Sequence, residues 1–227
     1  GARIRGLPLV IGGTPLQRFA TEEHTLEITN TSGKALTYAL RAGESIPGLS
    51  LRTTPAQLPL EPGQTGQLLL HFELDYELLS GSRRILPSLI LSTPAGSIPI
   101  GLTAAIESRV TPRTALLELG HDDPTLTSWS APGSVELTNR MQDGSARYQV
   151  TLKDFQCVSC ETPPPSGLIQ ASISPSTFTL PPGASIRLDL KLSIPRNSEL
   201  PDGQYRGMIS LAPAESPGSA ELLIPVT

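Results

Sequence analysis

The segment LRTTPAQLPLEPGQT, residues Leu51–Thr65, aligns with a second segment of the chain, ASISPSTFTLPPGAS, residues Ala171–Ser185. The separation between Pro55 and Pro175 in the sequence is the same as that between Gly63 and Gly183. Each copy contains a Pro-Gly turn dipeptide, in which Pro fixes φ and Gly accepts positive φ. Each then runs into an alternating apolar segment, which indicates a strand with one face on a core. The chain therefore carries an internal repeat of strands and turns.

The repeat extends in both directions from this stretch. Upstream, Thr25–Asn30 matches Ser134–Asn139, and each segment predicts a short strand that ends at an Asn turn. Downstream, each copy closes with an alternating strand, near Ile98 in the first and near Leu222 in the second. About seven short strands per copy, with frequent turn signals, are typical of an antiparallel sandwich. We therefore expect an all-β chain of two tandem immunoglobulin-like antiparallel β-sandwich domains, residues 1–108 and 109–227.

Composition agrees with short strands and narrows the function. The 227 residues include 23 Pro and 20 Gly, which break helices and punctuate strands. The formal net charge is −4 with no basic block, so nucleic-acid binding is not expected. No run of about 18 apolar residues is present, so the sequence does not predict insertion into a membrane.

The second copy carries a motif with a family resemblance. Its parts are Ser174-Pro175, Leu180-Pro181-Pro182-Gly183 and the segment Leu200–Gly207. This pattern resembles bacterial extracytoplasmic immunoglobulin-like modules on surface and carbohydrate-active proteins, and it is similar to the periplasmic chaperones of chaperone–usher pili. The resemblance implies a location in the periplasm or on the cell surface and a function in binding another protein.

The pilus-chaperone resemblance implies a particular binding strand. Those chaperones lend an alternating apolar strand to an incomplete pilin, and the matching residues here are Ile98, Ile100 and Leu102. They also anchor a carboxylate with two basic residues, for which Arg109 and either Arg3 or Arg5 are the counterparts by position. Two other features oppose this interpretation: the two copies are unusually alike, and Pro99 cannot donate a ladder hydrogen bond. The alternative is an ordinary last strand that faces its own core.

The two cysteines form a CxxC motif, Cys157 and Cys160. A redox site of this type needs a helix N-terminus, and the following Pro163-Pro164-Pro165 predicts no helix. A zinc site would need two further ligands, and there are no other cysteines. We expect a local disulfide if the protein is exported, with reduced structural thiols and metal or redox chemistry as the alternatives.

No catalytic set is readable, so we do not expect an enzyme. The hydrolase motifs G-x-S-x-G and H-E-x-x-H do not occur. His121-Asp122-Asp123 is interpreted as a solvated loop, and the pair Glu22-Glu23 as part of an exposed face. No metal site or cofactor is predicted.

The single tryptophan, Trp129, supports a minor alternative. An exposed aromatic ring could form a platform for a sugar, and the same residue could instead pack as a plug between the domains. Three functions follow, in order of preference: a protein-binding or scaffolding module of a bacterial envelope or surface protein, a periplasmic chaperone that acts by strand donation, and an accessory sugar-binding module. The identity of the partner is not encoded in any motif.

Overall fold

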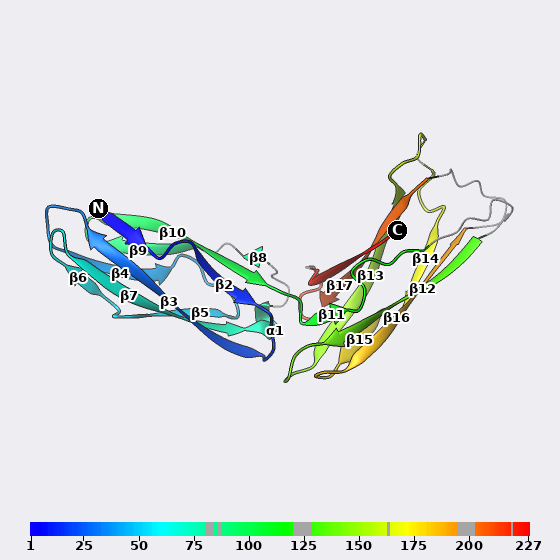
Figure 1. Cartoon of the computed structure of the whole chain (residues 1–227), viewed down its shortest axis with the longest axis horizontal. Coiled ribbons are helices and arrows are strands. Elements are labelled where there is room, and N and C mark those ends of the chain that lie inside the picture. Colours follow the sequence, from blue (N-terminus) through cyan, green and yellow to red (C-terminus); the bar gives the residue numbers. More distant parts are fainter. Residues whose placement is uncertain (80–83, 86–87, 120–128, 163, 195–202, 219) are drawn as a thin grey trace. The chain divides into compact units, whose positions relative to one another are not determined.

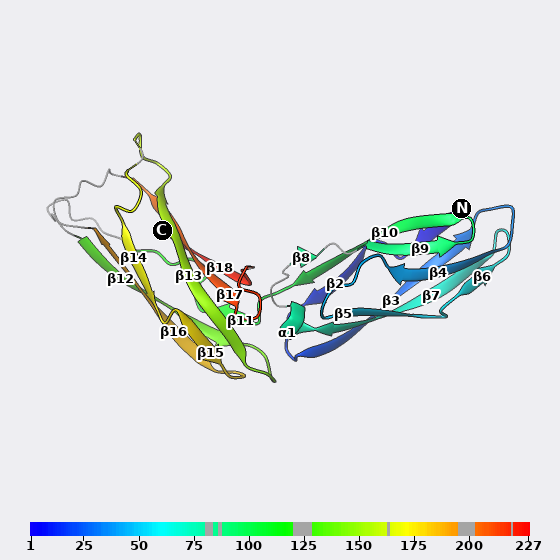
Figure 2. The same cartoon turned by 180° about the vertical axis from the view of Figure 1, so that it is seen from behind.

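The computed structural model describes residues 1–79, 84–85, 88–119, 129–162, 164–194, 203–218 and 220–227. The chain divides into two compact units, Gly1–Glu107 and Ser108–Thr227. The second unit therefore begins one residue before the boundary expected from the sequence. Each unit consists of two β-sheets that form a sandwich, as Figures 1 and 2 show. The fold is all-β with two immunoglobulin-like sandwiches.

In the first unit, one sheet has four strands and the other has five along its path with a short sixth at the side. The four-stranded sheet runs in the order β1 (Ala2–Arg5), β3 (Phe19–Asn30), β7 (Thr65–Asp75) and β5 (Leu49–Thr54). The second sheet runs β2 (Leu9–Gly13), β10 (Gly96–Ile106), β9 (Ser88–Thr93), β4 (Leu36–Ala42) and β6 (Leu58–Leu60), with β8 (Arg84–Ile85) beside β10. A single-turn helix, α1 (Tyr76–Leu79), follows β7.

The second unit repeats this plan, with fewer strands among its described residues. One sheet runs in the order β11 (Val110–Pro112), β12 (Trp129–Asn139), β16 (Ser185–Ile194) and β14 (Gln170–Ser174). The other runs β15 (Thr177–Leu180), β13 (Ala146–Cys157), β17 (Tyr205–Pro213) and β18 (Leu222–Val226). Leu117 bridges Val226 in parallel, as β2 pairs in parallel with β10 in the first unit.

Each core lies between the two sheets of its unit and uses the alternating residues of the repeat. In the first unit, Leu68, Leu70 and Phe72 of β7 point inward while their neighbours face out. Leu188, Leu190 and Leu192 of β16 do the same in the second unit. Because the period of a strand is two, one apolar residue in every two is sufficient to build each core.

Candidate functional site

The predicted partner-binding strand is β10, and its apolar side chains belong to the core of the first unit. Ile100 and Leu102 are buried, and Ile98 is half-buried against the same core. A folded first unit cannot lend these side chains to another protein without leaving a hole in its own core. The alternative of a core-facing last strand therefore describes these side chains.

The main-chain edge of β10 is different, because β2 covers only half of it. On one side, β10 pairs with β9 along Gly96–Gly101. On the other side, β2 pairs only with Leu102–Ile106, and no strand in the described part of the chain pairs with the first half of β10 there. The edge of the sheet therefore has a step: β2 forms the edge beside Leu102–Ile106, and Gly96–Gly101 of β10 forms the edge before it.

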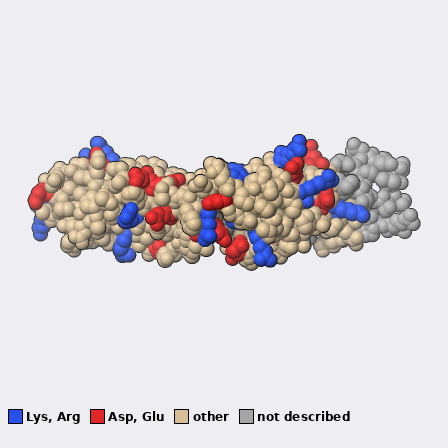
Figure 3. All heavy atoms as spheres, turned by 90° about the horizontal axis from the view of Figure 1, so that it is seen from below, with Lys and Arg blue, Asp and Glu red and all other residues tan. Residues whose placement is uncertain are grey.

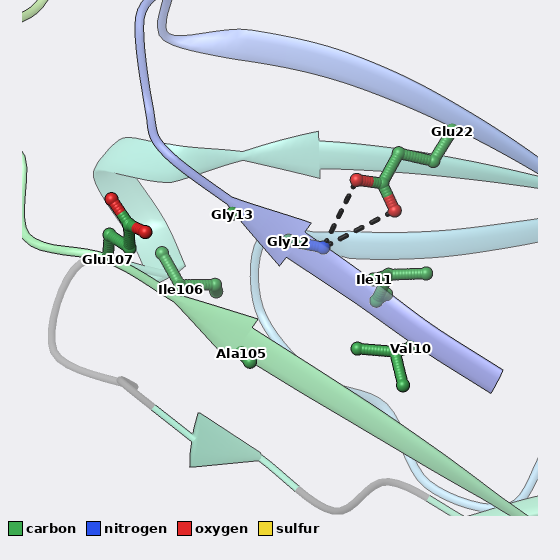
Figure 4. Close-up of a pocket in the computed structure, with 8 residues that line it drawn as sticks. All are labelled: Val10, Ile11, Gly12, Gly13, Glu22, Ala105, Ile106 and Glu107. Carbon is green, nitrogen blue, oxygen red and sulfur yellow. Dashed lines mark hydrogen bonds between the residues drawn. The ribbon is translucent and has the colours of Figure 1, made fainter. Parts of the chain in front are cut away.

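A cavity of about 580 Å³ lies at the other end of β2. Figure 4 shows its walls. It is lined by Val10, Ile11, Gly12, Gly13, Glu22, Ala105, Ile106 and Glu107. The lining combines apolar side chains with two carboxylates, one from each end of the cavity. A volume of this size falls within the usual range of small ligand sites, about 300–1,000 Å³.

Glu22 reaches this cavity from the opposite sheet. It lies on β3 on the same side of the strand as Leu26 and Ile28, which are fully buried, so its side chain points inward where the sandwich opens. Its Oε1 and Oε2 accept a hydrogen bond from the Gly12 N–H at N···O distances of 3.2 and 3.3 Å. The His24 Nε2 lies 3.7 Å from Oε2. The interpretation of Glu22 as part of an exposed face was therefore wrong.

Burial and the Glu22 charge also act on a neighbouring phenol. The Tyr76 side chain is buried, and this burial, together with the negative charge of Glu22, raises its pKa above the usual value. The neutral phenol is thus favoured beside the carboxylate. Glu107 is held separately, because its Oε2 accepts a 2.6 Å hydrogen bond from the Thr14 hydroxyl.

Arg109, predicted to anchor a carboxylate, is buried in the second unit and is paired there. Its side chain is 3% exposed and that of Glu221 is 1% exposed, with 3.2 Å between Nη2 and Oε2. The Glu221 Oε1 also accepts hydrogen bonds from the Arg109 main-chain N–H at 2.6 Å and from the Tyr148 hydroxyl at 2.9 Å. Burial lowers the pKa of the Arg109 guanidinium, but the charges and hydrogen bonds of Glu221 and Tyr148 together outweigh this and raise it overall. Arg109 therefore already holds a carboxylate, which belongs to its own unit.

The other predicted anchors and the cysteines are on the surface or half-buried. Arg3 and Arg5 are exposed on β1, and Arg5 lies 3.5 Å from Glu27. Cys157 and Cys160 form a disulfide at the end of β13. A Cβ atom at Gly203 would come within 2.9 Å of both sulfur atoms, so the chain that leads into β17 packs directly on the disulfide.

Several predicted features lie outside the described residues. His121-Asp122-Asp123 falls within 120–128, and the side chain of Trp129 is also outside them, although its main chain begins β12. Among the described residues, His, Cys, Asp and Glu form no group of three or more that could hold a metal ion. No helix in that part of the chain has the length and apolar character to span a membrane. On the face in Figure 3, acidic and basic side chains are interspersed over a largely uncharged surface.

Sequence reasoning missed Glu22 and Glu221 for different reasons. The strand was expected to begin near Thr25, whereas β3 begins at Phe19, so Glu22 joins the inward alternation of the core. The alternation that places Glu22 on the same side of the strand as Leu26 and Ile28 could have been read from the sequence. Glu221 has no such signal, because its burial depends on Arg109, which is 112 residues away in the sequence.

No protein-family model matches the sequence, and no curated protein sequence does either. Solved structures match the chain over most of its length, at low sequence identity. The Escherichia coli chaperone DraB is 11% identical, with a TM-score of 0.35, 99% of this chain covered and 97% of that one. The Pseudomonas aeruginosa CupB2 chaperone is 15% identical, with a TM-score of 0.33 and 92% of each chain covered. A protein of unknown function from Porphyromonas gingivalis W83 is 12% identical, with a TM-score of 0.38 and coverage of 99% and 97%.

Proposed function

We propose that this chain is a non-enzymatic, extracytoplasmic module that binds another protein by accepting one of its strands at the Gly96–Gly101 edge of β10. The observation that carries the proposal is the step in the sheet, where β2 covers only the second half of β10. Strand addition at an exposed edge gains its affinity from main-chain hydrogen bonds. The binding strand is then the one predicted from the sequence, used through its main chain rather than its side chains.

The alternation of the main chain identifies the groups that face the open edge. The N–H of Glu107, the residue after β10, donates to the Gly13 carbonyl at 2.9 Å. The odd-numbered residues of β10 therefore turn their main-chain N–H and C=O groups toward the β2 side. Counting back by twos, Ser97, Pro99 and Gly101 turn theirs toward the open side. Pro99 is thus on an edge, where a missing N–H costs no ladder bond within the unit. Ser97 and Gly101 supply N–H groups that a partner strand can use.

An extracytoplasmic location is supported by the Cys157–Cys160 disulfide, because disulfides persist mainly in oxidising compartments. The periplasm or the cell surface would fit. The open edge is also kept short and carries a proline, as natural sheet edges are when they must avoid indiscriminate pairing. A specific partner strand is then favoured over self-aggregation.

The test is a proline placed on the edge. Peptides that bind the wild-type chain are selected from a displayed random library, and their affinity is measured again with Gly101→Pro. Proline removes one N–H and puts its ring where the partner strand must pass, so we expect at least about a tenfold loss of affinity, from one hydrogen bond of about 1 kcal/mol and the clash. Ser97→Pro repeats the test at a second position.

The matched control is Leu223→Pro in the second unit. Leu223 occupies the place in β18 that Pro99 occupies in β10, so this change creates in the second unit an edge proline that the first unit already carries. We expect Leu223→Pro to leave peptide affinity unchanged. Circular dichroism confirms that each variant folds. If peptides bind folded Gly101→Pro and Ser97→Pro as tightly as the wild type, the proposed edge is wrong.

A further inference from the structure

Beyond a bulge, β13 and β17 of the second unit continue as a pair of strands without a third. Their register shifts after Lys153, and pairing resumes at Gln156. In the described part of the chain, no other strand pairs with either of them there. We call Gln156–Cys160 and Gly203–Arg206 the ribbon. Because a two-stranded hairpin is only marginally stable in water, the ribbon needs other contacts to stay ordered.

Three contacts close the tip of the ribbon. The first is the disulfide between Cys157 and Cys160. The Val158 N–H donates to the Gln204 carbonyl at 2.8 Å, and the Gln204 N–H donates to the Ser159 Oγ at 2.7 Å. Both hydrogen bonds involve the two residues that the disulfide encloses. The disulfide therefore fixes the short loop that holds the chain leading into β17.

Gly203 lies directly against the disulfide. A Cβ atom there would be 2.9 Å from each sulfur atom, a distance that real Cβ atoms essentially never show. The disulfide thus occupies the space that a side chain at position 203 would take. When an S–S bond opens, the two sulfur atoms move from bonding distance to van der Waals contact. This separation changes the surface on which Gly203 packs, so the redox state of the cysteines acts on the start of β17.

The core of the second unit does not include the ribbon. Its buried residues on β13 and β17, among them Val150, Ile209 and Leu211, lie on the other side of the bulge. No residue of the ribbon, all of which is described, belongs to this core. The disulfide joins residues only three positions apart, and so short a loop restricts the unfolded chain less than a long one does. Opening the disulfide should therefore loosen the ribbon and leave the sandwich folded.

Solvent reaches the disulfide. Both cysteines are half-buried, and Val158 between them is 51% exposed. Exposed disulfides are more easily reduced than buried structural ones, because a thiolate must reach one of the sulfur atoms. The first unit has no counterpart, since the chain contains only two cysteines. This disulfide therefore combines access from solution with a local effect on the structure.

We propose that the Cys157–Cys160 disulfide is a redox latch: a dithiol of another protein opens it, a disulfide oxidant closes it, and its state controls the order of the ribbon. A thiolate of the dithiol attacks one sulfur atom, the S–S bond breaks, and the other cysteine leaves as a thiolate that takes up a proton. The second thiol then attacks the mixed disulfide, which releases the first cysteine and leaves the dithiol oxidised to a disulfide. Two electrons and two protons thus pass to the cysteines. The latch lies in the second unit and the β10 edge in the first, so it is a device separate from the proposed strand binding.

Amide hydrogen exchange by NMR on the full chain labelled with ¹⁵N tests the latch, with dithiothreitol as the dithiol. We expect the Val158 and Gln204 amides to exchange at least about tenfold faster after reduction, because the ribbon then opens locally at a lower free energy. The Ile209 amide, in the core part of β17, should keep its protection. Gly43, whose N–H donates to the Ser88 carbonyl in the first unit, is the control and should not change. Oxidised dithiothreitol should restore slow exchange.

A substitution at Gly203 tests the coupling between this position and the redox state. In a series of mixtures of reduced and oxidised dithiothreitol, free thiols are alkylated, and the mass of the intact chain gives the reduced fraction. We expect Gly203→Ala to raise the ratio of reduced to oxidised chain at least about tenfold, because its Cβ atom meets the sulfur atoms while they are bonded. Gly183→Ala, in the same unit, is the matched control: a Cβ atom there meets nothing within 4 Å, so the ratio should not change. Circular dichroism confirms that each variant folds.

Equal exchange of the Val158 and Gln204 amides in both redox states would overturn the proposal. Loss of protection at Ile209 on reduction would also overturn it, because the disulfide would then support the whole unit. A disulfide that dithiothreitol does not reduce in the folded chain, or a ratio that Gly203→Ala leaves unchanged, would contradict it as well. If Gly203→Ala does not fold, the exchange measurement on the wild-type chain decides. None of these measurements uses a peptide, so their failure is distinct from failure of the β10 edge.

Discussion

In each unit a buried asparagine makes nearly the same set of hydrogen bonds. Asn30 ends β3 and Asn139 ends β12, and both side chains are fully buried. The Nδ2 of Asn30 donates to the Leu60 carbonyl at 2.9 Å, and that of Asn139 donates to the Leu180 carbonyl at 3.0 Å. The main-chain carbonyl of each asparagine accepts from the glycine of the Pro-Gly turn. The repeated turn motif is therefore tied to the core by the same residue twice.

The tyrosines beside these asparagines differ between the units. The Tyr38 hydroxyl donates to the Gly1 carbonyl at 2.8 Å and lies 3.2 Å from the Asn30 Oδ1. The Tyr148 hydroxyl donates to Glu221, which also binds Arg109. Gly1 and Arg109 occupy corresponding places, since each carbonyl accepts from the residue after the corner asparagine. One unit thus satisfies its tyrosine with neutral groups, and the other with a buried ion pair.

This difference teaches which parts of the repeat are constrained. The corner asparagine bonds to main-chain groups, which do not depend on the surrounding sequence, so the same residue serves in both units. The tyrosine needs only an acceptor, and either a carbonyl or a carboxylate supplies it. The second unit consequently contains the buried ion pair of Arg109 and Glu221, in which removal of either residue would leave the other charge buried without a partner.

Removal of one member of that pair should have the largest effect. Glu221→Ala leaves the Arg109 guanidinium buried without its carboxylate, and we expect the second unit to lose about 3–5 kcal/mol of unfolding free energy. Urea unfolding followed by the fluorescence of Trp129, the single tryptophan, reports this unit. Glu215→Ala, at an exposed glutamate of the same unit, should change it by less than about 0.5 kcal/mol. Similar small effects of both changes would show that the ion pair contributes little.

The corner asparagines should give smaller and equal losses. Asn30→Ala and Asn139→Ala each leave a buried carbonyl without its donor, which costs about 2 kcal/mol in the affected unit. Hydrogen-exchange mass spectrometry, which separates peptides of the two units, measures both. A difference of more than about 1 kcal/mol between the two variants would mean that the corners are not equivalent.

Alkaline pH should lower the unfolding free energy of the second unit, by less for each pH unit than either asparagine substitution does. Burial and then the Glu221 charge raise the pKa of Tyr148 strongly. Its contribution is complete below the unfolded pKa of about 10 and is lost as pH rises toward the folded pKa, at no more than about 1.4 kcal/mol per pH unit. Urea unfolding at pH 9 and pH 11 checks this, and Tyr148→Phe should remove most of the dependence. An unchanged pH dependence in Tyr148→Phe would assign it to other groups.

The sequence predicted the framework well and the polar interior poorly. Pro55 and Pro175, with Gly63 and Gly183, located equivalent turns, because turn residues act through their own backbone conformation. The Asn turns at Asn30 and Asn139 were also located, but not the burial of their side chains. Arg109 was expected to face a partner, and its pairing with Glu221 could not be read, because a long-range charge pair leaves no periodic signal.

The difference that bears most on function is in the last strand of each unit. In both units only the end of the last strand is covered on this side among the described residues: β2 pairs with β10 from Leu102 onward, and Leu117 bridges β18 at Val226, so the uncovered edge is longer in β10, at Gly96–Gly101, than in β18. Amide hydrogen exchange by NMR, with and without a selected peptide, tests this directly. We predict that the peptide slows exchange at Ser97 and Gly101 by at least about tenfold and leaves Leu223 unchanged. Protection at Leu223 instead, or at neither Ser97 nor Gly101, would contradict strand addition to the first unit.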